Sequence, residues 1–120
     1  MSMREQTYFI LAVLLDGPRH GYAIIKQVEE LSGNSVHLAA GTLYAALDRL
    51  NTAGLIETVR EEIVNGRSRR YYALTPEGET AVRTEAARMA TAARVVTDRT
   101  QQRAARSFGG VGGGAEVQPA

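Results

Sequence analysis

The chain has 120 residues, a net charge of +1 and 44% hydrophobic residues, as expected for one small globular domain. It has no cysteine, which excludes a disulfide framework and thiolate chemistry. Its longest apolar run, Tyr8 to Leu15, is far shorter than the roughly 20 residues of a membrane-spanning helix, and no signal-peptide pattern is present, so we expect a cytoplasmic protein without a membrane span.

The first predicted element is a helix from Arg4 to Leu15, which Gly17 and Pro18 end. Its residues are apolar nearly all round rather than along one stripe. Such a helix must be covered on every face. We therefore expect it to contribute both to the core and to a contact with a second copy of the chain.

Two further helices follow, each with one apolar stripe. In HGYAIIKQVEELSGN the stripe is Ile24, Val28 and Leu31, and Gly33-Asn34 closes the helix in the left-handed conformation. In AAGTLYAALDRLNTAG the helix is closed by Gly54. The residues of this third helix that we expect to face the core are Leu43, Ala46, Leu47 and Leu50.

A β-hairpin is predicted next, because the β-prone runs LIETVREEIV and RSRRYYAL are separated by Asn65-Gly66, which favours a two-residue type I′ turn. With this turn, Val64 faces Arg67, Glu62 faces Arg69, and Glu61 faces Arg70. Tyr72 and Leu74 then share one face of the hairpin, which should pack on the helices.

A fourth helix is predicted from Thr75-Pro76-Glu77 to about Arg106, since a capping hydroxyl, a proline and a carboxylate suit the start of a helix. The glycine-rich residues 107–120 should form a flexible tail. The helix carries a weak heptad seam that would let another helix approach closely, although a helix lying on its own core would look similar. The seam residues are Val82, Ala86, Met89, Ala93, Val96 and Thr100.

This order of elements predicts a mainly α fold with a two-stranded β wing, namely a winged helix-turn-helix followed by a long C-terminal dimerisation helix. Residues 1–75 would be the DNA-binding domain, residues 76–106 the dimerisation helix and residues 107–120 the tail. In this fold the third helix enters the major groove of DNA, and the wing lies along the backbone or minor groove.

Three stretches, LDGPRHGYAIIKQVEE, GTLYAALDRLNTAGLIE and GRSRRYYALTPEG, together resemble the PadR family of winged-helix transcriptional regulators over about residues 5–80. The single C-terminal helix is similar to the short subfamily. The resemblance implies a homodimer that binds a pseudo-palindromic operator in double-stranded DNA and represses transcription. Many relatives release DNA when a small aromatic or hydrophobic effector binds in the dimer region. The chain departs from the family pattern at Ala40 and Ala45, where relatives often have a hydroxyl residue and proline, and it has no tryptophan.

The candidate DNA contacts come from the start of the second helix, the third helix and the wing. Arg67 has no acidic neighbour in the predicted register, whereas Arg69 and Arg70 would also fit an ordinary solvated sheet face. Tyr44 would also fit a half-buried packing role, and the alternative for "RHGY" is a capping histidine followed by a packed tyrosine. The full set is His20, Tyr22, Thr42, Tyr44, Ala45, Arg49, Arg67, Arg69 and Arg70.

A dimer and effector region is predicted between the first and fourth helices. A cavity there would suit a flat apolar ligand, and a fully packed seam in a constitutive DNA binder is the alternative. The residues expected in this region are Phe9, Ile10, Val13, Val82, Met89, Ala93 and Val96.

Catalysis, metal binding and a cofactor are not expected. His20 and His37 are the only histidines, and no close carboxylate cluster has the spacing of metal ligands. The alternative to a DNA-binding repressor is a winged-helix module that binds a ligand or a protein but not DNA, because a fold does not determine a function.

Overall fold

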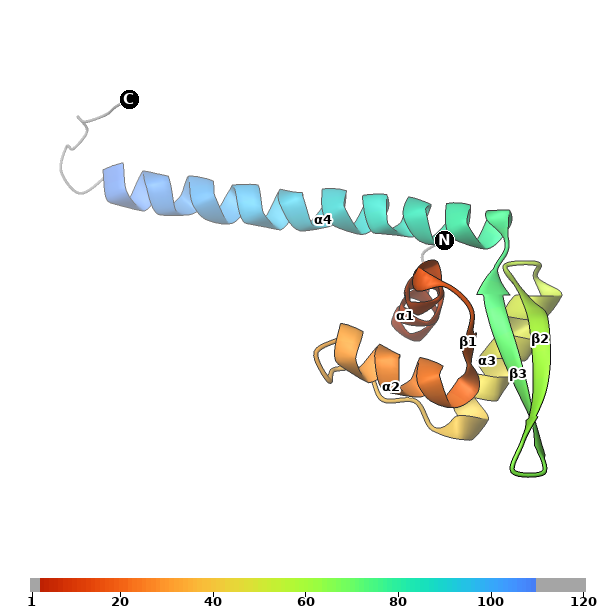
Figure 1. Ribbon diagram of the computed structural model, residues 1–120. Coiled ribbons are helices and arrows are strands. Elements are labelled where there is room, and N and C mark those ends of the chain that lie inside the picture. Colours follow the sequence, from red (N-terminus) through yellow and green to blue (C-terminus); the bar gives the residue numbers. More distant parts are fainter. Residues whose placement is uncertain (1–2, 110–120) are drawn as a thin grey trace. The chain divides into compact units, whose positions relative to one another are not determined.

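The computed structural model describes residues 3–109, which form two units that meet between Glu85 and Ala86. The first turns of the last helix belong to the first unit, and the remainder of that helix is the second. In chain order the elements are α1 (Glu5–Val13), the 3-10 turn η1 (Leu14–Asp16), β1 (Arg19–His20), α2 (Gly21–Leu31), α3 (Ala40–Thr52), β2 (Ile56–Val64), β3 (Arg67–Leu74) and α4 (Pro76–Gly109) (Figure 1).

The long C-terminal helix and the wing are present as the sequence predicts. Helix α4 continues to Gly109 rather than ending near Arg106, and the part of the predicted glycine-rich tail from residue 110 onward lies outside the described residues. None of the helices within residues 3–109 is long and apolar enough to cross a membrane.

The sheet is antiparallel and has the strand order β1-β3-β2. Strands β2 and β3 form the predicted hairpin in the predicted register, for example with Glu61 opposite Arg70. Asn65 and Gly66 have φ values of 51° and 77°, as a type I′ turn requires. The structure adds the short strand β1, whose two residues pair with Tyr72 and Tyr71.

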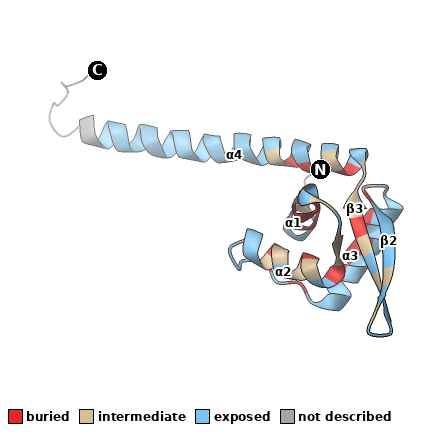
Figure 2. Ribbon diagram, in the orientation of Figure 1, coloured by how far each residue is buried: buried red, intermediate tan, exposed pale blue. Residues whose placement is uncertain are grey.

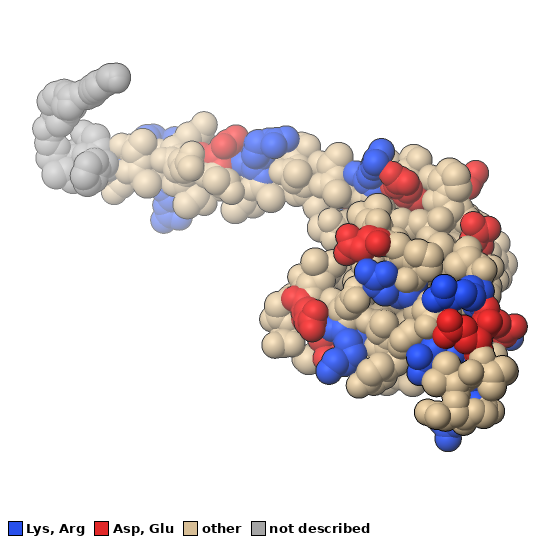
Figure 3. Space-filling model, in the orientation of Figure 1, with Lys and Arg blue, Asp and Glu red and all other residues tan. Residues whose placement is uncertain are grey.

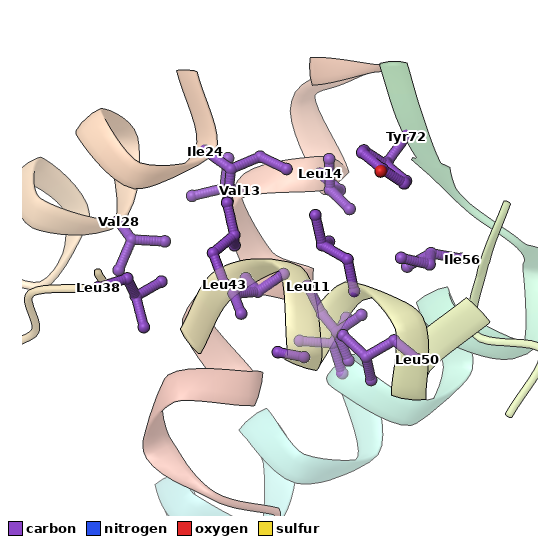
Figure 4. Packing of buried hydrophobic residues seen from close by; sticks show 14 of the residues in the cluster. Leu11, Val13, Leu14, Ile24, Val28, Leu38, Leu43, Leu50, Ile56 and Tyr72 are labelled. Atoms are coloured by element: carbon purple, nitrogen blue, oxygen red, sulfur yellow. The ribbon is translucent and has the colours of Figure 1, made fainter. Parts of the chain in front are cut away.

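The core of the first unit lies between α1, α2, α3 and the sheet, with Tyr72 closing it on the β3 side (Figures 2 and 4). Of the predicted apolar stripe of α2, Ile24 and Val28 are buried in this core, whereas Leu31 is 54% exposed. Leu31 is the last residue of α2, so the helix ends before the stripe can continue into the core. The predicted stripe of α3 is buried at every position: Leu43, Ala46, Leu47 and Leu50.

The start of α4 is tied to the segment that follows α3. The Thr75 hydroxyl accepts a hydrogen bond from the Gly78 backbone N–H at 3.0 Å and donates one to the Gly54 carbonyl oxygen at 2.6 Å. Thr75 is therefore the predicted helix cap and also a link to the end of α3. Gly78 is buried, and a Cβ added there would lie 2.9 Å from the carbonyl carbon of Leu55.

The second unit, residues 86–109, is a single helix that is exposed along nearly all of its described length (Figure 2). Large apolar side chains that are exposed on residues 86–107 are those of Met89, Val95 and Val96. Its sequence contains one acidic residue, Asp98, and the basic residues Arg88, Arg94, Arg99, Arg103 and Arg106.

Candidate nucleic-acid interface

A hollow of about 900 Å³ opens in the first unit between the start of α2, the middle of α3 and the hairpin. Six of the nine predicted DNA contacts line it: His20, Tyr22, Tyr44, Arg67, Arg69 and Arg70. The other lining residues are Gly21, Asp48, Val64, Asn65, Ser68 and Tyr72. Side chains that are far apart in the sequence are thus gathered around one concave surface.

The three remaining predicted contacts lie on α3 outside this hollow. Thr42, Ala45 and Arg49 are all exposed, and their spacing of three and four residues places them on one face of the helix. Tyr44 and Asp48, which are four residues apart, share the neighbouring face toward the hollow. The exposed side of α3 therefore has one face beside the wing and one face clear of it.

The lining of the hollow suits an anion better than a metal ion. It contains three arginines and three tyrosines but a single carboxylate, that of Asp48. Guanidinium groups and hydroxyl groups are common ligands of phosphate oxygens. Across the described range, 3–109, there is no group of three or more His, Cys, Asp or Glu side chains that could hold a metal ion.

A glycine brings the Tyr44 side chain against the start of α2. A Cβ on Gly21 would overlap the Tyr44 hydroxyl oxygen and lie 2.8 Å from the ring atom Cζ. Tyr44 is nevertheless 48% exposed. The side chain thus packs on Gly21 along one side and is open to the hollow along the other. Sequence reasoning missed this role of Gly21, because nothing in "RHGY" shows which side chain the glycine will meet.

His20 caps α2. Its Nδ1 accepts a hydrogen bond from the Ala23 backbone N–H at 3.3 Å, and its ring stands edge-on to Tyr71 with centroids 5.4 Å apart. Burial of the imidazole and the nearby charge of Arg69 lower the pKa of His20, and Glu62 opposes the shift. His20 is therefore the capping histidine of the alternative interpretation of "RHGY". Tyr22 does not follow that interpretation, because it is 66% exposed and does not pack.

We expect this cap to lose strength in mild acid. Since the pKa of His20 in the folded protein lies below its ordinary value of 6.5, the unfolded chain takes up the proton more readily. The stabilisation is complete above pH 6.5 and is lost as the pH falls through the folded pKa. The measurement is the free energy of unfolding of the wild type and of His20→Asn from about pH 8 to about pH 5, since asparagine caps helices without titrating. The difference in free energy of unfolding between the wild type and His20→Asn should shrink toward low pH. A difference that stays constant with pH would contradict a titrating cap at His20.

The arginines of the wing differ in their partners. The Arg70 Nε donates to Glu61 Oε2 at 3.0 Å, as the register predicts, and this hydrogen bond lowers the pKa of Glu61. Glu62 lies opposite Arg69, as the register predicts, but its ion-pair partner is Arg60, with Nε 3.6 Å from Oε2. Within residues 3–109, Arg67 and Arg69 have no ion-pair partner closer than 4.0 Å. Basic and acidic side chains are accordingly interspersed over the visible face of the first unit (Figure 3).

The residues predicted for the dimer and effector region lie in different environments. Ile10, Val13 and Val82 are 0%, 2% and 2% exposed in the core of the first unit. Val13 also borders a hollow of about 280 Å³ that opens between α1, η1 and α2. Phe9 is partly buried against the same core and meets Tyr8 edge-on at 5.5 Å between ring centroids. Met89, Ala93 and Val96 belong to the second unit, where all three are exposed.

The sequence matches the transcriptional regulator PadR-like family over residues 10–84. One curated relative is the transcriptional regulator Rv3488 of Mycobacterium tuberculosis, 41% identical over 54 residues that make up 45% of this chain and 50% of that protein. Another is an uncharacterized 37.1 kDa protein in transposon TN4556 of Streptomyces fradiae, 39% identical over 90 residues, 75% of this chain and 24% of that protein. The chain thus spans from 24% to 64% of the length of the curated relatives it matches.

Solved structures with a similar fold include regulators of the same family. A PadR family transcription regulator from Clostridium difficile has a TM-score of 0.68 and 30% identity, over 81% of this chain and 99% of that chain. PadR of Bacillus subtilis in complex with operator DNA has a TM-score of 0.61 and 27% identity, over 68% of this chain and 46% of that chain. Members of the family are transcriptional regulators rather than enzymes. With a family match that covers more than half of its length, the chain belongs to the transcriptional regulator PadR-like family.

Proposed function

We propose that the protein binds an operator in double-stranded DNA through the hollow and the adjoining exposed face of α3. The observation that carries this proposal is the convergence of Arg67 and Arg69, which have no ion-pair partner within residues 3–109, with Tyr44 and the start of α2 around one concave surface. The similar fold of PadR from Bacillus subtilis, whose solved structure includes operator DNA, supports it.

In this proposal α3 lies in the major groove and its two exposed faces have separate tasks. Ala45 offers a methyl group to a thymine methyl, and Arg49 reaches a base edge or a phosphate. Tyr44, Arg67 and Arg69 hold phosphates on the side of the hollow. Because α3 presents few side chains that can read bases, we expect much of the sequence preference to come from the shape and deformability of the DNA.

We further propose that two copies form a homodimer in the cytoplasm and repress transcription at a pseudo-palindromic operator. A symmetric dimer places two recognition helices on two half-sites, which matches an operator of that symmetry. The exposed apolar side chains Met89 and Val96 and the small residue Ala93 between them support α4 as the dimer contact. A small hydrophobic effector would act by changing the spacing of the two copies.

The alternative function is a winged-helix module that binds a ligand or a protein but no DNA. One observation favours it: residues 1–85 contain nine Lys or Arg but eleven Asp or Glu, so this part of the chain is not basic as a whole. Binding to the promoter of its own gene, measured as a mobility shift over a salt series, separates the two functions.

Arg67→Ala should weaken operator binding while leaving the free energy of unfolding unchanged, because Arg67 is exposed beside the turn and has no ion-pair partner within residues 3–109. Loss of one phosphate contact should reduce the slope of log K against log salt by about 0.9. Arg83→Ala is the matched control, since Arg83 is paired with Glu79 on α4, away from the hollow. Equal slopes for Arg67→Ala and the wild type would remove Arg67 from the interface.

Ala93→Trp should remain a dimer and bury its indole between the two copies if the seam contains an open cavity. The native chain has no tryptophan, so the fluorescence of the introduced indole reports on this one position. We expect a blue-shifted emission that moves to the red when the dimer dissociates on dilution. The control is Thr91→Trp, because Thr91 is exposed and lies two residues away on a different side of the helix. Its indole should show the emission of a solvated indole at every protein concentration. A variant that is monomeric at every concentration would show that the seam is closed.

A further inference from the structure

Glu62 lies directly opposite Arg69 on neighbouring strands, yet the two do not pair. Opposite charges at such positions normally attract each other across a sheet. Both oxygens of the Glu62 carboxylate are engaged elsewhere. Oε1 accepts a hydrogen bond from the Tyr71 hydroxyl at 3.1 Å, and Oε2 lies 3.6 Å from the Arg60 Nε.

Arg60 is held in place by a second contact. Its guanidinium carbon lies 4.0 Å from the centroid of the Tyr71 ring, within the range of a cation–π interaction. The strand register shifts between Thr58 and Arg60, and this irregularity brings Arg60 opposite Tyr71. Arg60 and Glu62 are two residues apart on β2, so their side chains share one face of the strand.

Arg69 is left for another partner. It is half-buried and lines the hollow together with His20 and Gly21 at the start of α2. A phosphate held at this end of α2 would meet both the guanidinium of Arg69 and the positive end of the helix.

We propose that Arg60 is a positioning residue for DNA binding: with Tyr71 it occupies the Glu62 carboxylate and so leaves Arg69 unpaired for a phosphate. The inference rests on the proposed function. Two arginines compete for one half-exposed carboxylate, with side-chain exposures of 57% for Arg60 and 39% for Glu62. Removal of Arg60 therefore frees Glu62 to pair with Arg69, which lies directly opposite.

The test is a set of DNA affinities at low salt. Arg60→Gln should weaken operator binding by about fivefold, the upper end for an exposed ion pair. Glu62→Gln should restore most of that loss in the Arg60→Gln variant but change the affinity of the wild type little. In an Arg69→Gln background, Arg60→Gln should have no further effect. Arg4→Gln removes the same charge at the exposed residue before α1 and is the control for net charge.

A second measurement does not need DNA. The charge of Arg69 contributes to the lowered pKa of His20. In the Arg60→Gln variant, Arg69 should turn toward Glu62, and the pKa of His20 should therefore rise. An NMR titration of His20 measures this change. The pKa of His20 in the double variant Arg60→Gln/Arg69→Gln should equal that in Arg69→Gln alone. If the wild type binds no DNA, the proposed function is wrong, and the NMR titration decides whether Arg60 keeps Glu62 from Arg69. If DNA binds but Arg60→Gln has the same effect with and without Arg69, the inference alone is overturned.

Discussion

Gly78→Ala should destabilise the first unit by about 3 kcal/mol, the upper end of the usual cost of overpacking. Its Cβ would overlap the carbonyl oxygen of Leu55 and lie 3.0 Å from Leu74 Cδ2. The Leu55 oxygen belongs to the backbone and accepts a hydrogen bond from the Thr75 N–H at 3.1 Å, so it cannot rotate away as a side chain would. The overlap can be removed only if the start of α4 moves away from the core, and this movement would also strain the hydrogen bonds of Thr75.

The measurement is the free energy of unfolding by urea denaturation. Gly41→Ala is the matched control, because Gly41 is also helical and a Cβ there would meet nothing within 4 Å. On helix propensity alone, Gly41→Ala should leave the free energy of unfolding unchanged or raise it by up to about 1 kcal/mol. If Gly78→Ala is as stable as the control, the start of α4 is not fixed against Leu55.

Gly21→Ala should have the second largest effect, in this case on the interface. The added Cβ takes the space of the Tyr44 hydroxyl, and the ring must swing into the hollow where we propose that DNA binds. Loss of the Tyr44 contact and partial blocking of the hollow should together weaken DNA binding by about tenfold or more, the equivalent of roughly 1.4 kcal/mol. The free energy of unfolding should change less, since alanine favours the helix and Tyr44 has room to move on its exposed side.

A double-mutant cycle with Tyr44→Ala tests this reasoning. When the ring is absent, Gly21→Ala has no side chain to displace and should cost no further affinity. A loss of the same size in both backgrounds would mean that Gly21 acts through its own backbone, for example by close approach of a phosphate, rather than through Tyr44.

Much of the fold follows from short-range signals in the sequence. The Asn65-Gly66 turn sets the register of the hairpin, because two consecutive residues with positive φ leave few alternatives. Thr75 and Pro76 mark the start of α4, and the four-residue stripe of α3 identifies its buried face. From that face the exposed positions of α3 follow. The three predicted arginines of the wing gather at the hollow with Tyr44, whereas the other predicted contacts of α3 lie outside it.

The features that the sequence did not indicate depend on contacts between distant residues. The partner of Glu62 could not be chosen from the hairpin register alone, because Arg60 and Arg69 are both within reach and the Tyr71 ring decides between them. The close approaches at Gly21 and Gly78 involve Tyr44 and Leu55, more than twenty residues away in each case. The strand β1 is too short for an alternating pattern to be visible.

The pairing of β1 with β3 has a consequence for the order in which the protein is made. Arg19 and His20 leave the ribosome early, but their partners Tyr72 and Tyr71 follow only after α2, α3 and β2 have been synthesised. Until then the edge at β1 has no strand to pair with, and the nascent helices lack the sheet that closes the core. We therefore expect the helices to remain only loosely packed during translation and to consolidate in one step when β3 emerges. A nascent chain stalled before Tyr71 should accordingly be digested by protease, whereas one stalled well beyond Val82 should resist it.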